Sequence, residues 1–170
     1  MQPPLFEWLD QALYGVGEAK TFAALLREIE QRECEIIWED DRYVRLVQVV
    51  LVEVFSSAGK LIEDRQEFTD GRSRRRGIEG ISEKRRRDEN PLDAARRALR
   101  EELGIAAAID LTFVQQTTGE KLSPSYPGLL SRYTKDLFTC YLPDELIQPK
   151  YVEIQDDKKT FFVWKPSTHF

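Results

Sequence analysis

The sequence predicts an α/β protein in which one amphipathic helix in the middle of the chain packs on a mixed β-sheet. Short segments rich in β-branched and aromatic residues lie on both sides of residues 91–103. Residues 91–103 themselves repeat apolar side chains at the period of a helix, through Leu92, Ala95, Leu99 and Leu103. Mixed strands around one strong helix are typical of a layered α/β domain.

The N-terminal part of the chain is expected to be helical. Apolar residues follow a helix period over residues 5–13 and again over residues 21–33, where Thr21 can cap the second helix. We therefore predict an N-terminal helical extension over residues 1–34 and one main domain over residues 35–170. The extension could also provide a contact for a homodimer.

The main domain is expected to contain six strands, separated by turns and two long polar loops. Residues 69–89 carry three glycines and many charges, which is typical of a functional or mobile loop, and residues 119–128 are a second loop rich in Pro, Ser and Gly. The strands are expected at residues 35–38, 43–55, 61–68, 111–117, 133–142 and 160–164.

Composition narrows the functional class. The chain has 170 residues, 41% hydrophobic and 32% charged, which suits a folded domain, and its net charge of −5 disfavours nucleic acid as a partner. Cys34 and Cys140 lie far apart and indicate neither a zinc site nor a disulfide. His169 is the only histidine, so a Ser/His or Cys/His catalytic pair is poorly supported. With no signal peptide or membrane-spanning run in view, we expect a cytoplasmic protein without a membrane partner.

The central helix has strong start and stop signals. Asn90 is a good N-cap residue, Pro91 suits the first helical position, and Asp93 lies in the first turn, where the helix dipole favours an anion. Gly104 occupies the position where a left-handed residue usually ends a helix. The sequence therefore predicts a helix from Pro91 to Leu103.

Two adjacent glutamates, Glu101 and Glu102, lie near the C-terminal end of this helix. The helix dipole opposes carboxylates there, and a hard divalent cation such as Mg²⁺ would remove that penalty. The alternative is a solvated glutamate pair with Arg97 and Arg100 as its neighbours. Helix geometry alone leaves both interpretations open.

The segment resembles the signature of the Nudix hydrolases, G-x5-E-x7-R-E-U-x-E-E-x-G-U, where U is a bulky aliphatic residue. The resemblance covers roughly residues 44–165 and includes the flanking strands. It implies a Nudix-like α/β/α sandwich with a mixed β-sheet. The matching residues, at the correct spacing, are Glu89, Arg97, Leu99, Glu101, Glu102, Gly104 and Ile105.

The chain departs from the signature at two positions. Ala98 replaces the glutamate that follows the motif arginine, and that glutamate is commonly a metal ligand in the family. The spacing of the signature places the opening glycine at Glu83, whereas the nearest upstream glycine is Gly80. An insertion of residues 84–87 accounts for the shift.

The resemblance implies a role for each matching residue. Glu101 and Glu102 would be ligands of Mg²⁺ or Mn²⁺, with Glu102 the firmer assignment, and with Arg97 they form the expected catalytic group. Arg97 and Glu89 would orient the site, and Gly80 would supply a backbone carbonyl near the metal. Gly104 and Glu89 are otherwise structural members of the motif.

The expected activity is cleavage of a phosphoanhydride bond in a small phosphorylated, nucleotide-like substrate, a nucleoside diphosphate derivative. A metal-bound water would attack phosphorus. The resemblance leaves Glu120, Glu145 and Glu153 as candidates for the general base. Because Ala98 removes one carboxylate, the alternative function is a catalytically impaired Nudix-fold protein that binds a ligand or regulates.

Arginines crowd the long loop before the central helix. They could grip the phosphates of a ligand, because guanidinium groups bind phosphate through two hydrogen bonds. The alternatives are a solvated loop and, less favoured in an acidic chain, a nucleic-acid contact. The candidate phosphate-binding residues are Arg74, Arg75, Arg76, Arg85 and Arg86.

Overall fold

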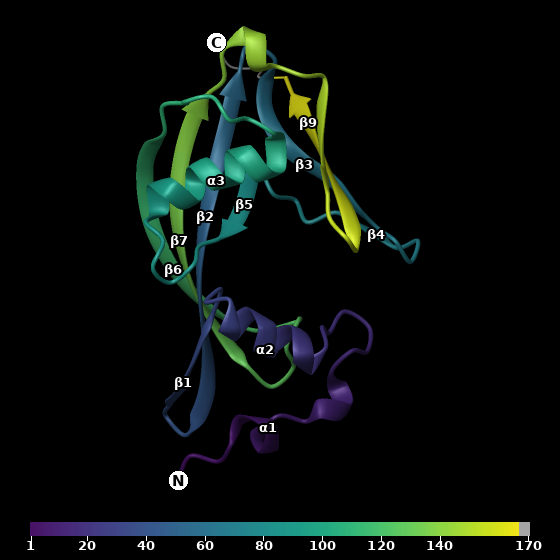
Figure 1. The fold of residues 1–170 in the computed structure, drawn as a ribbon, viewed down its shortest axis with the longest axis vertical. Coiled ribbons are helices and arrows are strands. Elements are labelled where there is room, and N and C mark those ends of the chain that lie inside the picture. Colours follow the sequence, from purple (N-terminus) through teal and green to yellow (C-terminus); the bar gives the residue numbers. More distant parts are fainter. Residues whose placement is uncertain (167–170) are drawn as a thin grey trace. The chain divides into compact units, whose positions relative to one another are not determined.

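The computed structural model describes residues 1–166 as an α/β protein with one large sheet, which confirms the predicted fold class (Figure 1). His169 lies outside the described residues. The elements in chain order are α1 (Leu5–Trp8), η1 (Gln11–Leu13), α2 (Phe22–Glu30), β1 (Glu35–Glu39), β2 (Arg42–Ser56), β3 (Gly59–Phe68), β4 (Ser73–Arg74), β5 (Ile81–Lys84), α3 (Pro91–Leu103), β6 (Thr112–Leu122), β7 (Leu130–Tyr141), η2 (Asp144–Leu146), β8 (Lys150–Ile154) and β9 (Lys158–Lys165).

The nine strands within residues 1–166 form one sheet whose main path is β6-β7-β2-β3-β9-β8, while β1 and β5 pair with β2 and β4 pairs with β3. The β2–β3 hairpin and the β3–β9 and β8–β9 pairs are antiparallel. In Figure 1 the arrows of the neighbouring strands β2 and β7 point the same way. The sheet is therefore mixed, as the sequence predicted.

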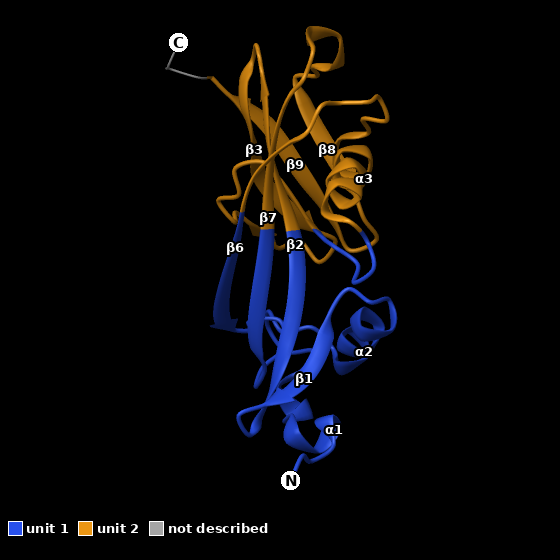
Figure 2. Cartoon of the chain, turned by 90° about the vertical axis from the view of Figure 1, so that its left-hand side faces the viewer, with its two compact units in different colours: residues 1–49, 84–89, 116–135 blue, residues 50–83, 90–115, 136–170 orange. Residues whose placement is uncertain are grey.

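The chain divides into two compact units, coloured separately in Figure 2. The expected boundary at residue 34 is not a boundary of these units, because the N-terminal residues group with β1 and with two later segments. Unit 1 consists of residues 1–49, 84–89 and 116–135, and unit 2 of residues 50–83, 90–115 and 136–170.

Unit 2 has a core between α3 and the strands of this unit. Ala94, Ala95, Ala98 and Leu99 on α3 are all buried against it. The apolar stripe thus packs as its helical period predicts. Leu92 is the exception: we expected it to be buried, but it is only partly buried at the edge of this core, because it lies in the first turn of the helix.

Unit 1 has a second core that combines aromatic packing with a buried ionic network. Leu25 of α2 and Tyr126 are fully buried there. Glu28, also on α2, accepts hydrogen bonds from Arg45 Nη2 at 2.7 Å, Lys84 Nζ at 2.6 Å and Tyr126 Oη at 2.8 Å. The network joins four separate segments of unit 1, and the predicted cap is present, since Thr21 Oγ1 accepts from the backbone of Ala24.

Several elements differ from the sequence-based expectation. The polar segment 69–89 contains two short strands, β4 and β5, where only a loop was expected. Strand β6 continues through Gly119 to Leu122, although residues 119–128 were expected to form a loop, and β8 was not predicted. The first helix is short because Leu9 adopts an extended conformation after α1.

No helix among residues 1–166 is both long enough and apolar enough to cross a membrane.

Candidate functional site

Helix α3 begins and ends where its capping residues predict. Asn90 Oδ1 accepts hydrogen bonds from the backbone N–H of Leu92 at 2.8 Å and of Asp93 at 3.3 Å. At the other end Gly104 is left-handed, with φ 70°, and its N–H donates to the carbonyl of Arg100. These caps fix the register of the helix, and therefore the positions of the side chains in its last turn.

Glu102 is the buried carboxylate of this last turn, with 7% of its surface exposed. Burial raises its pKa well above the usual value, and the negative charges of Glu153, Glu83 and Glu63 raise the pKa further. Arg76 lowers it, but not enough to offset the other effects. An ionised Glu102 is therefore costly unless a cation compensates its charge.

Glu153 on β8 belongs to the same group of carboxylates. Burial is the largest cause that raises its pKa, to about 7, and Glu83, Glu101 and Glu63 add to the effect against the attraction of Lys158. A carboxyl group with such a pKa can both hold and release a proton near neutral pH.

The structure thus distinguishes the three candidates for the general base by their surroundings. Only Glu153 lies close enough to influence Glu102. Glu120, on β6, accepts a hydrogen bond from Arg132 Nε at 2.7 Å, and Glu145 is an exposed residue of η2.

Arg97 lies between two carboxylates on the partly exposed side of α3. Its Nη1 is 3.1 Å from Glu101 Oε2 and 3.8 Å from Glu83 Oε1, and only 11% of the Arg97 side chain is exposed. Glu101 is 44% exposed. The two adjacent glutamates therefore differ: Glu101 pairs with its helical neighbour at the surface, and Glu102 is directed into the protein.

Glu63 and Glu83 are members of the group that the sequence reasoning did not assign. Glu63 on β3 has a side chain that is 2% exposed, and Arg76 binds both of its oxygens at 2.9 and 2.6 Å. Its signal in the sequence is its position two residues after Leu61, because alternate residues of a strand share one face. A charged residue at a core-facing position of a strand indicates a partner or a functional role.

The two positions that depart from the Nudix signature are both buried. Ala98 is 0% exposed and packs in the core of unit 2, one turn before Glu102. Gly80 is buried as well, with φ 124°, and a Cβ built there would lie 2.2 Å from the carbonyl oxygen of Val52. A side chain at residue 80 would therefore collide with the backbone of β2.

The candidate phosphate-binding arginines before β5 are already paired. Arg74 Nε donates to Gln66 Oε1 at 2.7 Å, and Arg75 Nη1 donates to Asp64 Oδ1 at 2.9 Å. Together with the Arg76–Glu63 pair, these contacts show that residues 74–76 brace β3 in the absence of a ligand.

Three further candidate residues, Glu89, Arg85 and Arg86, lie in unit 1. Glu89 Oε1 accepts a hydrogen bond from the backbone N–H of Arg86 at 3.3 Å, which holds the turn before α3. The Arg86 side chain is exposed, and Arg85 is half-buried in the wall of a pocket.

The carboxylates around Glu102 do not form a complete metal site by themselves. Within residues 1–166, no three or more His, Cys, Asp or Glu side chains are grouped so that they could hold a metal ion by themselves. Mg²⁺ does not require such a cage, because one or two carboxylates, several waters and the phosphates of a substrate usually complete its shell. The carboxylate oxygens of Glu102 and its neighbours are the donors that this ion prefers.

Comparison with known proteins gave matches among solved structures alone: no family model matches the sequence, and no curated protein matches it. The Escherichia coli dihydroneopterin triphosphate pyrophosphohydrolase is 19% identical over 69% of this chain and 78% of that chain, with a TM-score of 0.48. The Caenorhabditis elegans Ap4A hydrolase is 15% identical over 68% and 79%, with a TM-score of 0.38.

A third structure comes from a comparison of MutT of Aliivibrio salmonicida with MutT of Vibrio cholerae. It is 18% identical over 70% of this chain and 80% of that chain, with a TM-score of 0.33. The chain resembles the Nudix hydrolases.

Proposed function

We propose that this chain is a divalent-metal-dependent hydrolase that cleaves the diphosphate linkage of a small, nucleotide-like phosphorylated compound. The observation that carries the proposal is the buried carboxylate of Glu102 on α3, whose pKa the negative charges of Glu153, Glu83 and Glu63 raise beyond the effect of burial. Burying like charges together opposes folding, so such a group is expected where a cation binds. Its position in a Nudix-like box directs the proposal to phosphoanhydride chemistry.

In this proposal each residue of the site has a separate role. Glu102 would hold Mg²⁺ or Mn²⁺, and Glu101, which is 44% exposed, would turn from Arg97 to join it. Arg97 holds Glu101 in the metal-free protein and positions Glu83. The ion would neutralise the diphosphate and lower the pKa of a bound water.

Glu153 is the proposed general base. A base works best when its pKa lies near the working pH, and the pKa of Glu153 is raised to about 7. Its carboxylate would accept the proton of the attacking water. Lys158, whose charge lowers this pKa, would keep part of the Glu153 population ionised.

The decisive experiment measures metal binding and hydrolysis together. Wild-type protein should release phosphate or pyrophosphate from at least one member of a panel of nucleotide sugars, dinucleoside polyphosphates and nucleoside triphosphates when Mg²⁺ or Mn²⁺ is present. Glu102→Gln should lower the rate by about one to several orders of magnitude while keeping the fold. Glu145→Gln, which changes an exposed glutamate of η2, is the matched control and should keep the wild-type rate. Full activity of Glu102→Gln would reject the assigned site.

A second function, that of a Nudix-fold ligand-binding or regulatory protein without turnover, is favoured by Ala98. The residue lies in the core, and no carboxylate takes its place on α3. Calorimetric titration with Mn²⁺ separates the two proposals. If the wild type binds no metal and cleaves no member of the panel, and a stably folded Ala98→Glu is equally inert, the non-catalytic function is the correct one.

A further inference from the structure

Unit 1 contains a pocket of about 280 Å³ between the end of α2, strands β1 and β2, and the segment that follows β5. None of the carboxylates of the candidate catalytic site lines it. Its volume lies just below the range of roughly 300–1,000 Å³ that is usual for small-molecule sites, so it suits a small ligand. Its lining residues are Arg32, Glu33, Cys34, Glu35, Leu46, Gln48, Arg85 and Arg87.

Two backbone hydrogen bonds join segments that line this pocket. The N–H of Arg85 donates to the carbonyl of Gln48 at 2.8 Å, and the N–H of Arg87 donates to the carbonyl of Arg32 at 3.0 Å. Arg32 itself has a left-handed backbone, with φ 61°, directly after α2. The arginines are therefore carried on backbone that is held in place before any ligand arrives.

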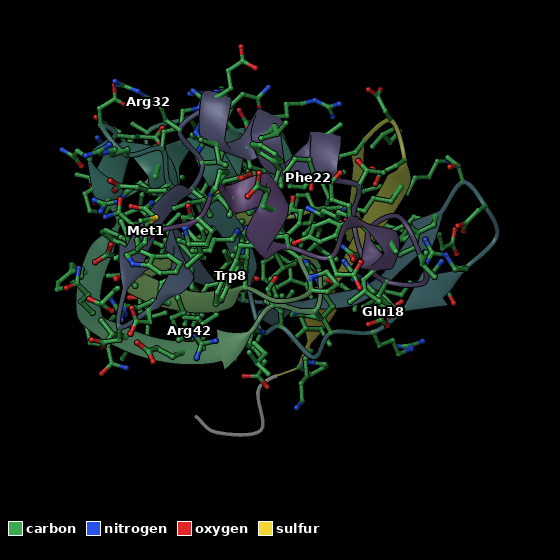
Figure 3. The ribbon with its side chains drawn as sticks, turned by 90° about the horizontal axis from the view of Figure 1, so that it is seen from below. Met1, Trp8, Glu18, Phe22, Arg32 and Arg42 are labelled. Atoms are coloured by element: carbon green, nitrogen blue, oxygen red, sulfur yellow. The ribbon has the colours of Figure 1, made fainter. Side chains whose placement is uncertain are left out.

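The three arginines of the pocket are neutralised to different degrees. Arg32 Nη1 is 3.1 Å from Asp88 Oδ2, and Arg87 Nη1 is 3.6 Å from Glu35 Oε1. Arg85 has no ion-pair partner within residues 1–166. The side chain of Arg32 is 62% exposed. Figure 3 labels this residue near the edge of the molecule. An anion could thus reach one unneutralised guanidinium flanked by two others.

Two buried polar atoms beside this cation lack partners. Arg85 Nε and Gln48 Oε1 are both inaccessible to solvent, and neither makes a hydrogen bond. Each such atom opposes folding, because it loses its hydrogen bonds to water and gains none within the protein. Both atoms belong to side chains that line the pocket, so rotation of these side chains toward the cavity would let a ligand accept a hydrogen bond from Arg85 and donate one to Gln48.

We propose that this pocket binds a small molecule carrying a phosphate group and hydroxyl groups, such as a sugar phosphate. The phosphate lies on Arg85, with Arg32 and Arg87 beside it, because guanidinium groups match phosphate oxygens in pairs. A hydroxyl group donates to Gln48 Oε1. Other hydroxyl groups donate to the carboxylate of Glu33 or Glu35, which would repel a ligand that is anionic throughout.

The test uses three probes and needs no metal, so it is independent of the proposed hydrolysis. Ribose 5-phosphate, inorganic phosphate and ribose are titrated into the full chain by calorimetry and by protein NMR. Ribose 5-phosphate should bind more tightly than either fragment, and its shift changes should map to residues 32–35, 46–48 and 85–87. Arg85→Gln should weaken its binding by about tenfold or more, the usual effect of losing one charge-assisted hydrogen bond.

Arg27→Gln is the matched control, because Arg27 is an exposed arginine of α2 that does not line the pocket. It should bind ribose 5-phosphate as the wild type does. If Arg85→Gln does not fold, Arg32→Gln replaces it, since that side chain is mostly exposed, and a severalfold weaker affinity is expected. The proposal is overturned if no probe binds the wild type at millimolar concentration, if the substitutions in the pocket and the control have equal effects, or if the NMR shifts map elsewhere. Equal affinity for phosphate and ribose 5-phosphate would also reject it.

Discussion

At the scale of single residues, Glu102 and Ala98 show how far a motif determines a site. They lie one turn apart on α3 and both are buried, but only Glu102 carries a charge. The period of the helix predicts that Glu102 lies beside the apolar stripe, and Glu102 is buried on α3. The sequence could not locate Glu63 or Glu153 as neighbours of Glu102, because those residues come from strands far away in the chain and meet it only through the fold.

Glu102→Gln is expected to stabilise the metal-free protein while it removes activity. The folded protein keeps the pKa of Glu102 raised, so the ionised carboxylate opposes folding near neutral pH, and an uncharged amide removes that repulsion. The melting temperature in EDTA should therefore rise, by roughly 2–4 °C for each kcal/mol gained. Glu101→Gln, at the exposed neighbour, should show no such gain. A lower melting temperature for Glu102→Gln would contradict the predicted repulsion.

Gly80→Ala should destabilise the chain much more than Gly77→Ala. Both glycines have a positive φ, but only at Gly80 would a Cβ collide with backbone, 2.2 Å from the carbonyl oxygen of Val52. A left-handed alanine costs about 1–2 kcal/mol, and the collision adds roughly 1–3 kcal/mol. Denaturant unfolding of the two variants measures the difference. Equal losses of stability would show that β2 can move away from residue 80.

At the scale of elements, helices and strands with strong local signals were predicted well. Helix α3 has the predicted bounds, because its caps and its apolar period agree. Strand β8 was missed since it has only five residues, and β5 was hidden in a charged segment that pairs with β2. The end of β6 was missed for another reason: all its residues are exposed, so no alternation between buried and exposed faces marks it.

Leu99→Ala tests the packing of α3 on the sheet. The side chain is 2% exposed in the core of unit 2, so its truncation should lower the free energy of unfolding by about 2–5 kcal/mol. Arg100→Ala changes an exposed residue of the same helix and should stay within about 0.5 kcal/mol of wild type. A similar small effect at both residues would mean that α3 does not pack as described.

At the scale of the whole molecule, length suggested one main domain, but the described chain has two compact units with separate cores. Strand β2 contributes to both, through Tyr43 and Val47 in unit 1 and through Val50 and Val52 in unit 2. A hydrophobic pattern in the sequence does not reveal which core a residue joins, because residues of both cores are apolar and buried. The ionic network around Glu28 could not be predicted from the sequence either, because the partners of Glu28 come from distant segments of the chain.

Because of this network, the stability of unit 1 should depend on pH in the acidic range. Burial alone would raise the pKa of Glu28, but Lys84 and Arg45 outweigh it and lower that pKa to about 2. A depressed pKa stabilises the fold above the unfolded value of 4.5, and the contribution disappears as the pH falls from 4.5 through 2. The lowered pKa corresponds to a contribution of about 3 kcal/mol.

Glu28→Gln should therefore have two effects that denaturant unfolding at several pH values can separate. At pH 7 it leaves Arg45 buried without its counter-ion, which should cost about 3–5 kcal/mol. Below pH 4.5 its stability should fall less steeply than that of the wild type, because the titrating group is gone. Glu30→Gln, at an exposed position of the same helix, should follow the wild-type curve. If Glu28→Gln and the wild type lose stability in parallel between pH 4.5 and pH 2, the acid sensitivity arises elsewhere and Glu28 is not the group that links folding to pH.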